Sequence, residues 1–328
     1  MRKSHWLGAT AIVLLATNPA WSADKVVFQL DWLPNGDKAA IYHGIELGIF
    51  EAADIEVEFS PGRGSSDAIT KLATGVSDIG FGGLGALMTA EAEGDIPVKA
   101  IMPVYTKQPD AIFTTSDGPI QQITDLADKT IATAPFSSSN ATWPLLLEVN
   151  EIDGSTIELL KAEPASLAPM LATGQVDGTI NWVTVAPLAA SVLEEAGKEL
   201  LVIPWSEYGF DGYGLSLLAS DKTIEERPDV LQRFTDAMKE AIKAANADPS
   251  AAATSLQKHV SETDVEVATA GYSASVPLIE NEITDASGFG VFDADRLEET
   301  WKWVAESNGY AKDAIDPQAL IANQFATN

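Results

Sequence analysis

The chain has 328 residues, 48 of them acidic and 20 basic, so its formal charge is −28, and it contains no cysteine. This charge disfavours binding to nucleic acid or to an anionic membrane surface. The absence of cysteine excludes disulfides, zinc–thiolate sites, a thiol nucleophile and a lipidated amino-terminal cysteine. Because the length exceeds that of most single domains, we expect two lobes.

Residues 1–23 have the pattern of a secretory signal peptide. Arg2 and Lys3 precede a short apolar run over 6–16, and small residues follow near Ser22 and Ala23. Cleavage after Ser22 fits the small-residue pattern better than cleavage after Ala23; a retained anchor is the alternative. The apolar run is too short to span a bilayer, and no later stretch reaches about 18 apolar residues. We therefore expect a periplasmic protein with a cleaved signal peptide, not a lipoprotein, without direct membrane insertion.

Two strand–loop–helix units and a third strand follow the signal peptide. Residues 26–30 form a short apolar strand, and a turn at 31–36 leads into a helix over 38–50 with apolar residues at helical spacing. Strands at 55–59 and 79–81 also end in glycine-bearing loops. Such units predict a parallel sheet, and ligands of open α/β sheets bind outside the carboxyl edge of the strands.

The middle of the chain predicts a second lobe between two crossings. An extended run over 98–115 is interrupted at 107–110, and an aromatic, glycine-bearing stretch at 205–214 precedes another apolar segment. Further strands are expected at 131–134, 157–160 and 201–204, a strand and loop at 176–182, and an apolar segment at 215–219. Helices are expected at 68–74, 84–94, 141–150, 166–173, 185–196, 224–247, 250–260, 264–283 and 293–307. We assign residues 24–108 and 214–328 to lobe 1 and residues 109–213 to lobe 2.

Two Ser- and Gly-rich loops have the composition of an anion cradle. Backbone N–H groups at a helix N-terminus and Ser hydroxyls bind anions, and both are expected at 62–66 and at 137–140. Ordinary helix capping is the alternative for both loops. Arg63 would pair with a carboxylate or sulfonate, or would lie solvated on the surface. The candidate ligand residues in these loops are Arg63, Gly64, Ser65, Ser66, Ser137, Ser138, Ser139 and Asn140.

Aromatic and glycine residues at the other strand ends complete the candidate site. Aromatic rings there would wall the cleft against a flat ligand, or would pack the lobes and the hinge. Glycines after the third strand would bring backbone close to a ligand. These candidates are Trp32, Asn35, Gly82, Gly83, Leu84, Phe136, Asn181, Trp182, Tyr208 and Tyr213. Acidic residues near the loops that would instead accept a cation are Asp31, Asp37 and Asp67.

Three segments together resemble a known family. Asp31 to Asn35 reads DWLPN, residues 44–50 read GIELGIF, and residues 72–80 read LATGVSDIG. They resemble ABC-transporter substrate-binding proteins of the group that binds thiamine-pyrimidine precursors, taurine and alkanesulfonates. The resemblance implies the type II periplasmic-binding-protein fold: two α/β lobes, each a mainly parallel sheet flanked by helices, joined by two hinge crossings. The loop at 61–66 is more similar to the sulfonate branch and DWLPN to the pyrimidine branch.

The resemblance implies a periplasmic protein, expected to be a monomer, that captures a small organic ligand and delivers it to a permease and its ATPase. From the two loops and Arg63 we expect a carboxylate or sulfonate, on a body that is aromatic or a pyrimidine. No catalytic residue, cofactor or metal is assigned, and no nucleic-acid partner. An enzyme of pyrimidine metabolism is one alternative, but its yeast relatives use a Cys-rich motif and a histidine, and this chain lacks cysteine. A ligand-sensing domain is the other.

Overall fold

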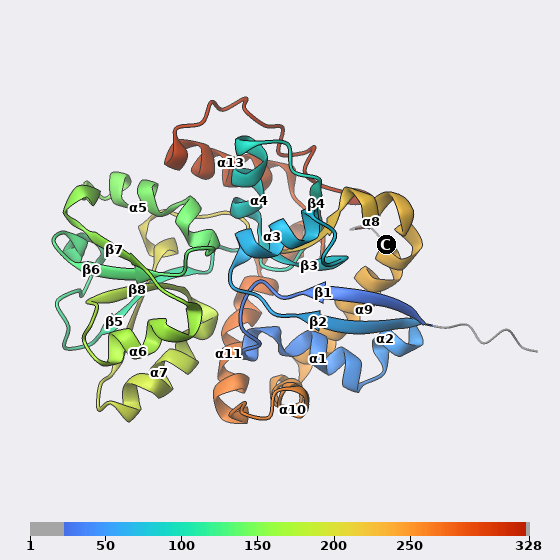
Figure 1. Cartoon of the computed structure of the whole chain (residues 1–328), viewed down its shortest axis with the longest axis horizontal. Helices are drawn as coiled ribbons and strands as arrows, with labels where there is room; N and C mark the ends of the chain where they lie inside the picture. Colours follow the sequence, from blue (N-terminus) through green and yellow to red (C-terminus); the bar gives the residue numbers. More distant parts are fainter. Residues whose placement is uncertain (1–22, 326–328) are drawn as a thin grey trace, which may run out of the picture.

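A computed structural model describes residues 23–325, so the expected signal peptide lies outside the described residues except for Ala23. Two five-stranded sheets form the centres of two lobes that lie side by side (Figure 1). The first sheet has the order β2-β1-β3-β10-β4 and the second β7-β6-β8-β5-β9. The strands are β1 (Asp24–Gln29), β2 (Ile55–Ser60), β3 (Ile79–Gly83), β4 (Val98–Pro103), β5 (Asp110–Thr115), β6 (Thr130–Thr133), β7 (Glu158–Lys161), β8 (Gly178–Trp182), β9 (Leu200–Pro204) and β10 (Leu215–Ser220).

One strand in each sheet runs against the others. In the first sheet β10 pairs antiparallel with β3 and β4, and in the second β5 pairs antiparallel with β8 and β9. The remaining pairs are parallel. Every residue of β5 and of β10 is buried, as expected for a strand that is covered on both faces. The predicted fold class, two mainly parallel α/β lobes, is confirmed.

Helices cover both faces of each sheet. Apolar side chains of α1, α9 and α10 pack on one face of the first sheet, and those of α3, α4 and α13 on the other. On the second sheet α5 covers one face, and α6 and α7 the other. The helices are α1 (Ala39–Glu46), α2 (Ile49–Ala52), α3 (Ser65–Ala73), α4 (Leu84–Glu93), α5 (Trp143–Val149), α6 (Leu167–Ala172), α7 (Ala186–Glu195), α8 (Asp221–Glu226), α9 (Pro228–Ala247), α10 (Pro249–His259), α11 (Val265–Ile279), α12 (Glu282–Ser287) and α13 (Ala294–Asn308). Among residues 23–325 no helix is long and apolar enough to cross a membrane.

Three helices that we predicted as continuous are divided, and local residues explain each break. Gly48 adopts φ 73°, a left-handed conformation that ends α1 before α2 begins. Pro228 is the first residue of α9, a position where its missing N–H costs nothing, so α8 and α9 are separate. The side chain of Asn281 accepts from the Ile283 N–H and starts α12 after α11 has ended.

The chain passes between the lobes twice, through residues 104–109 and 205–214. The buried Arg296 of α13 ties these segments together: its Nε donates to the Thr106 carbonyl and its guanidinium binds Asp211 and the Gly212 carbonyl. Both segments are thus fixed to one helix of the first lobe. The site lies beside them.

Candidate ligand-binding site between the lobes

Loops at the carboxyl ends of four strands line a partly open pocket, about 350 Å³ with the open solvent in it included, which we call the tryptophan cavity. The loops after β1 and β2 line it from the first lobe, and those after β6 and β8 from the second. Its lining residues are Asp31, Trp32, Asp37, Ser65, Ser137, Ser138, Asn181, Trp182 and Val185. This is the position that the strand–loop–helix pattern predicted for a ligand.

A buried lysine between two aspartates lies behind this cavity. The Lys38 side chain is fully buried, and its Nζ lies 2.9 Å from Asp31 Oδ1 and 2.9 Å from Asp37 Oδ2. The same Nζ lies 5.6 Å from the centre of the Phe81 ring and 5.5 Å from that of the Trp182 ring, within range of cation–π attraction. With both carboxylates ionised, the trio carries a net charge of −1.

Burial and the neighbouring charges act in opposite directions on Lys38 and Asp31. Burial alone would lower the pKa of Lys38, but the carboxylates of Asp31 and Asp37 raise it above its usual value. Burial raises the pKa of Asp31, an effect that the Lys38 ammonium opposes. In Asp37, Oδ2 lies against Lys38, whereas Oδ1 is buried and has no hydrogen-bond partner among residues 23–325. An unpaired buried acceptor costs about 1–3 kcal/mol, so this oxygen is a candidate contact for a ligand donor.

The two tryptophans of the cavity each pack on the opposite lobe. Trp32, from the loop after β1, contacts the apolar cluster under α6 and α7. Trp182, at the end of β8, contacts the cluster of the first lobe and lies edge-on to Tyr105, with ring centres 5.9 Å apart. Each ring therefore spans the cleft, and both are placed to cover an aromatic ligand.

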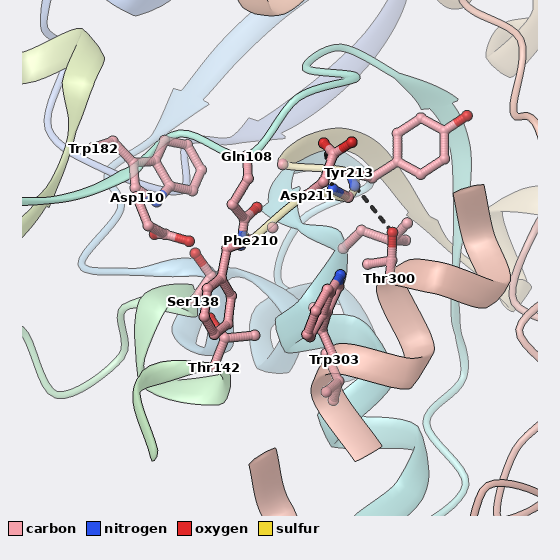
Figure 2. Close-up of a pocket in the computed structure, with 16 residues that line it drawn as sticks. Gln108, Asp110, Ser138, Thr142, Trp182, Phe210, Asp211, Tyr213, Thr300 and Trp303 are labelled. Carbon is pink, nitrogen blue, oxygen red and sulfur yellow. Dashed lines mark hydrogen bonds between the residues drawn. The ribbon is translucent and has the colours of Figure 1, made fainter. Parts of the chain in front are cut away.

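A second, partly open pocket, about 410 Å³ with the open solvent in it included, adjoins the first on the side of the crossings, and we call it the hinge cavity (Figure 2). Ser138 and Trp182 line both cavities. The other lining residues are Gly83, Leu84, Gly85, Gln108, Asp110, Thr142, Phe210, Asp211, Gly212, Tyr213, Gly214, Thr300, Trp303 and Val304.

Asp110, the first residue of β5, is a buried carboxylate in the wall of the hinge cavity. The Ser139 hydroxyl donates to its Oδ1 at 2.5 Å. Burial raises the pKa of Asp110 to about 6, although hydrogen bonds from the Ser139 and Trp182 side chains lower it. The folded protein therefore holds a proton here between about pH 4 and 6 that the unfolded chain has released, so stability falls as pH rises through this window.

We expect Asp110→Asn to raise the free energy of unfolding at pH 7, by up to about 3 kcal/mol, and to flatten its dependence on pH between 4 and 6. The amide has no charge to desolvate and still accepts from Ser139. Urea unfolding at pH 4, 5, 6 and 7 measures both effects. In the control, Asp211→Asn, the change should go the other way, because partial burial of Asp211 is outweighed by Arg296, which lowers its pKa. A less stable Asp110→Asn protein at pH 7 would contradict this assignment.

Two donors of the first expected anion cradle, at 62–66, are engaged by protein. The Ser66 N–H at the start of α3 donates to the Phe136 carbonyl of the second lobe at 3.2 Å. The Arg63 guanidinium binds the Glu163 carboxylate at 2.7 Å, and both side chains are about half exposed. Ser65 Oγ accepts from the Gly83 N–H at 2.9 Å. In this closed arrangement the loop joins the lobes and presents no free cation to the cavity.

The second expected cradle, at 137–140, is bonded in the same way. The Ser137 hydroxyl accepts from the Ser139 N–H, and the Ser139 hydroxyl donates to Asp110. Asn140 donates to the Ala134 carbonyl at 2.9 Å and accepts from Lys161. These contacts are those of a capped turn, the alternative stated above for both loops. Among the described residues that line either cavity, none is Lys or Arg.

The structure sorts the predicted ligand residues into three sets. The tryptophan cavity is lined by Trp32, Ser65, Ser137, Ser138, Asn181 and Trp182, and the hinge cavity by Ser138, Trp182, Gly83, Leu84 and Tyr213. Neither cavity is lined by Asn35, Arg63, Gly64, Ser66, Gly82, Phe136, Ser139, Asn140 or Tyr208. Asn35 lies in a separate surface groove beside α11.

Sequence reasoning did not assign Lys38, Asp110, Thr142 or Trp303 to the site. Lys38 reads as the polar start of a helix, although a lysine flanked by two nearby aspartates and followed by apolar residues is a usable signal. Asp110 was assigned to the polar segment 107–110 that interrupts the extended run over 98–115. Trp303 comes from a helix about 270 residues beyond the loop after β1, and no local pattern indicates its contact with Phe210.

Comparison with known proteins agrees with this architecture. Two α/β lobes joined by two crossings around a cavity define the periplasmic-binding-protein fold. The alkanesulfonate-binding protein SsuA from Xanthomonas axonopodis pv. citri, bound to MOPS, superposes with a TM-score of 0.71 at 15% identity over 91% of this chain and 98% of its own. Residues 35–252 match the family described as NMT1/THI5 like, and the chain belongs to this family. The predicted resemblance to the thiamine-precursor and sulfonate-binding group is confirmed.

Relatives with a stated activity include a binding protein and an enzyme. The riboflavin-binding protein RibY of Chloroflexus aurantiacus is 23% identical over 322 residues, covering 94% of this chain and 88% of the relative. The desulfurization enzyme DSZB superposes with a TM-score of 0.57 at 17% identity over 92% of this chain and 97% of its own. The fold is therefore shared by binding proteins and by at least one enzyme.

Proposed function

We propose that the protein binds a flat heteroaromatic compound that carries N–H donors and no negative charge, and that it delivers this compound to an ABC importer. The observation that carries the ligand class is Asp37 Oδ1, a buried carboxylate oxygen in the cavity wall without a partner among residues 23–325. A ring N–H or amino group would supply the missing donor, and a hydrogen bond to a charged group contributes about 1.5–3 kcal/mol. Trp32 and Trp182 supply aromatic surface around it.

This proposal replaces the carboxylate or sulfonate that we expected from the sequence. The Lys38 ammonium is already bound by two carboxylates, and Arg63 binds Glu163. An anion in the tryptophan cavity would meet the net negative trio at short range with little solvent to screen it. A neutral or cationic ring meets no such repulsion.

The named relatives differ in which ligand they suggest. RibY is named for riboflavin, whose ring system is flat and carries an imide N–H, whereas SsuA is named for alkanesulfonates. The chemistry of the tryptophan cavity favours the first of these classes. A pyrimidine with a ring N–H or an amino group is also flat and carries such a donor, and it belongs to the same proposal.

Transport is the role that this fold and family favour. The proposed partners are a permease and its ATPase, and the proposed site of action is the periplasm, with the protein acting as a monomer. Deleting the gene should abolish uptake of the bound compound by cells at low external concentration, and a point variant that folds but does not bind should fail to restore it. Normal uptake in the deletion strain would contradict the transport role.

We expect a flavin or pyrimidine screen by thermal shift to find a ligand, because a compound at 100 times its dissociation constant stabilises by about 2.7 kcal/mol. Small-angle scattering should then show a smaller radius of gyration with ligand, since contacts such as Arg63–Glu163 form only when the lobes close. A set of alkanesulfonates and aromatic carboxylates is the matched control. Tight binding of these anions alone, or an unchanged radius at saturation, would contradict the proposal.

The similarity to DSZB makes turnover the second candidate, and the same samples test it. A binding protein returns its ligand unaltered, so chromatography of the ligand after prolonged incubation should show no product. Formation of a product, catalytic or stoichiometric, would favour an enzyme.

A further inference from the structure

Two small residues from opposite lobes lie in close contact in the wall of the hinge cavity. Gly83 ends β3 in the first lobe, and a Cβ on it would lie 2.6 Å from Ser138 Cβ in the second. Ser138 also lines both cavities. Because the two cavities share Ser138 and Trp182 in their walls, they are neighbouring parts of one cleft when the lobes move apart. A ligand bound before closure can therefore extend from one cavity into the other.

The hinge cavity contains donors that the protein leaves unpaired. The Thr142 hydroxyl and the Trp303 indole N–H are buried and have no hydrogen-bond partner among residues 23–325. Thr142 is 5% exposed, and its side chain makes no cap bond at the start of α5. Figure 2 shows these two side chains on the same cavity as Gln108 and Asp110. Two buried polar atoms without partners in one cavity indicate a polar occupant.

The charge of the cavity restricts this occupant. Asp211 is bound by Arg296, whereas the Asp110 carboxylate has no cation within salt-bridge distance among the described residues. None of the described lining residues is basic. A phosphate would thus meet an acidic wall without a countercharge. A hydroxyl group, which both donates and accepts, satisfies Trp303, Thr142 and Asp110 alike.

We propose that the hinge cavity binds an uncharged, hydroxylated chain attached to the ring held in the tryptophan cavity, so that the ligand is a flat ring bearing a neutral polyol or sugar. This inference rests on the proposed function, because it needs the ring to occupy the first cavity. It adds a second recognition element, and it excludes the phosphorylated form of the same compound.

Two matched ligand series test the proposal by calorimetry. The first is lumiflavin, riboflavin and flavin mononucleotide; the second is uracil, uridine and uridine monophosphate. In the series that binds, the hydroxylated member should bind at least about tenfold more tightly than the bare ring, as expected for two or more added hydrogen bonds, and the phosphate should lose that gain. If the bare ring binds as tightly as the hydroxylated member, this inference is overturned and the proposed function stands. If no member of either series binds, the proposed function is overturned and the inference with it.

Two variants test whether the hydroxylated part of the ligand lies in the hinge cavity. Thr142→Val keeps the shape and removes the hydroxyl, and Trp303→Phe keeps a ring and removes the N–H. Each should weaken the hydroxylated ligand by roughly five- to tenfold and leave the bare ring unchanged. Trp205→Phe is the matched control: Trp205 Nε1 is also buried without a partner among residues 23–325, but Trp205 lines neither cavity. Equal losses of affinity for the bare ring and the hydroxylated ligand, or no loss in either variant, would show that the hydroxylated part of the ligand does not bind in the hinge cavity.

Discussion

Lys38→Met is expected to lower the free energy of unfolding at pH 7 by about 3–5 kcal/mol, the largest stability effect that we predict for a single side chain. Methionine fills much of the volume of lysine but leaves Asp31 and Asp37 buried without their shared cation. Two carboxylates with side chains 3% and 2% exposed would then repel each other in a medium that screens charge poorly. Urea or guanidinium unfolding of the purified protein measures the change.

The pH dependence of the free energy of unfolding distinguishes loss of the Lys38 charge from loss of its packing. Without Lys38 the pKa of Asp31 rises further, so acidification removes the repulsion between the two carboxylates, and the variant should recover stability relative to the parent as pH falls. Adding Asp37→Asn to Lys38→Met should recover part of the loss at pH 7. Lys25→Met is the control, since the Lys25–Glu56 pair is largely exposed and contributes less than about 1 kcal/mol. A Lys38→Met protein as stable as the parent at pH 7 would show that the trio is not charged as described.

The same trio shows why the ligand class was difficult to predict from sequence. Trp32 and Trp182 were recognisable because each follows a strand at the edge where ligands bind in such sheets. The sign of the local charge was not recognisable, because it depends on which side chains pair. Arg63 appears available in the sequence, yet its partner Glu163 is one hundred residues away in the other lobe. Lys38 appears solvated, yet it is fully buried.

The availability of backbone donors depends on the opposite lobe in the same way. A Gly- and Ser-rich loop before a helix has free N–H groups when considered alone, and the loop at 62–66 was interpreted in that way. In the closed protein the Ser66 N–H is occupied by the Phe136 carbonyl, which comes from the second lobe. Local sequence determines the strands, the helices and the loops between them. Contacts between lobes arise only after both lobes have folded and closed, and these contacts decide which groups remain free for a ligand.

Gly83→Ala is expected to weaken ligand binding by about 10- to 100-fold while changing the free energy of unfolding by less than about 1 kcal/mol. The backbone at Gly83 has φ −69° and ψ 132°, which alanine adopts without strain. The added methyl would lie 2.6 Å from Ser138 Cβ and 2.9 Å from Ser138 Oγ, both closer than side-chain atoms approach. Because Gly83 and Ser138 belong to different lobes, a small separation of the lobes relieves this clash. Within the first lobe the methyl meets Ser65 Oγ at 3.3 Å, which a shift of a few tenths of an ångström relieves.

The variant therefore acts on the population of the closed state, and apparent affinity falls in proportion to that population. Scattering should show that Gly83→Ala compacts less than the parent at saturating ligand. Removing the obstructing atoms with Ser138→Gly should restore compaction, so the double variant should bind as tightly as Ser138→Gly alone. That comparison also removes any direct contribution of Ser138 to the ligand, since serine is absent from both proteins. If the double variant binds no better than Gly83→Ala, the loss arises within the first lobe, and closure at this contact is not required for binding.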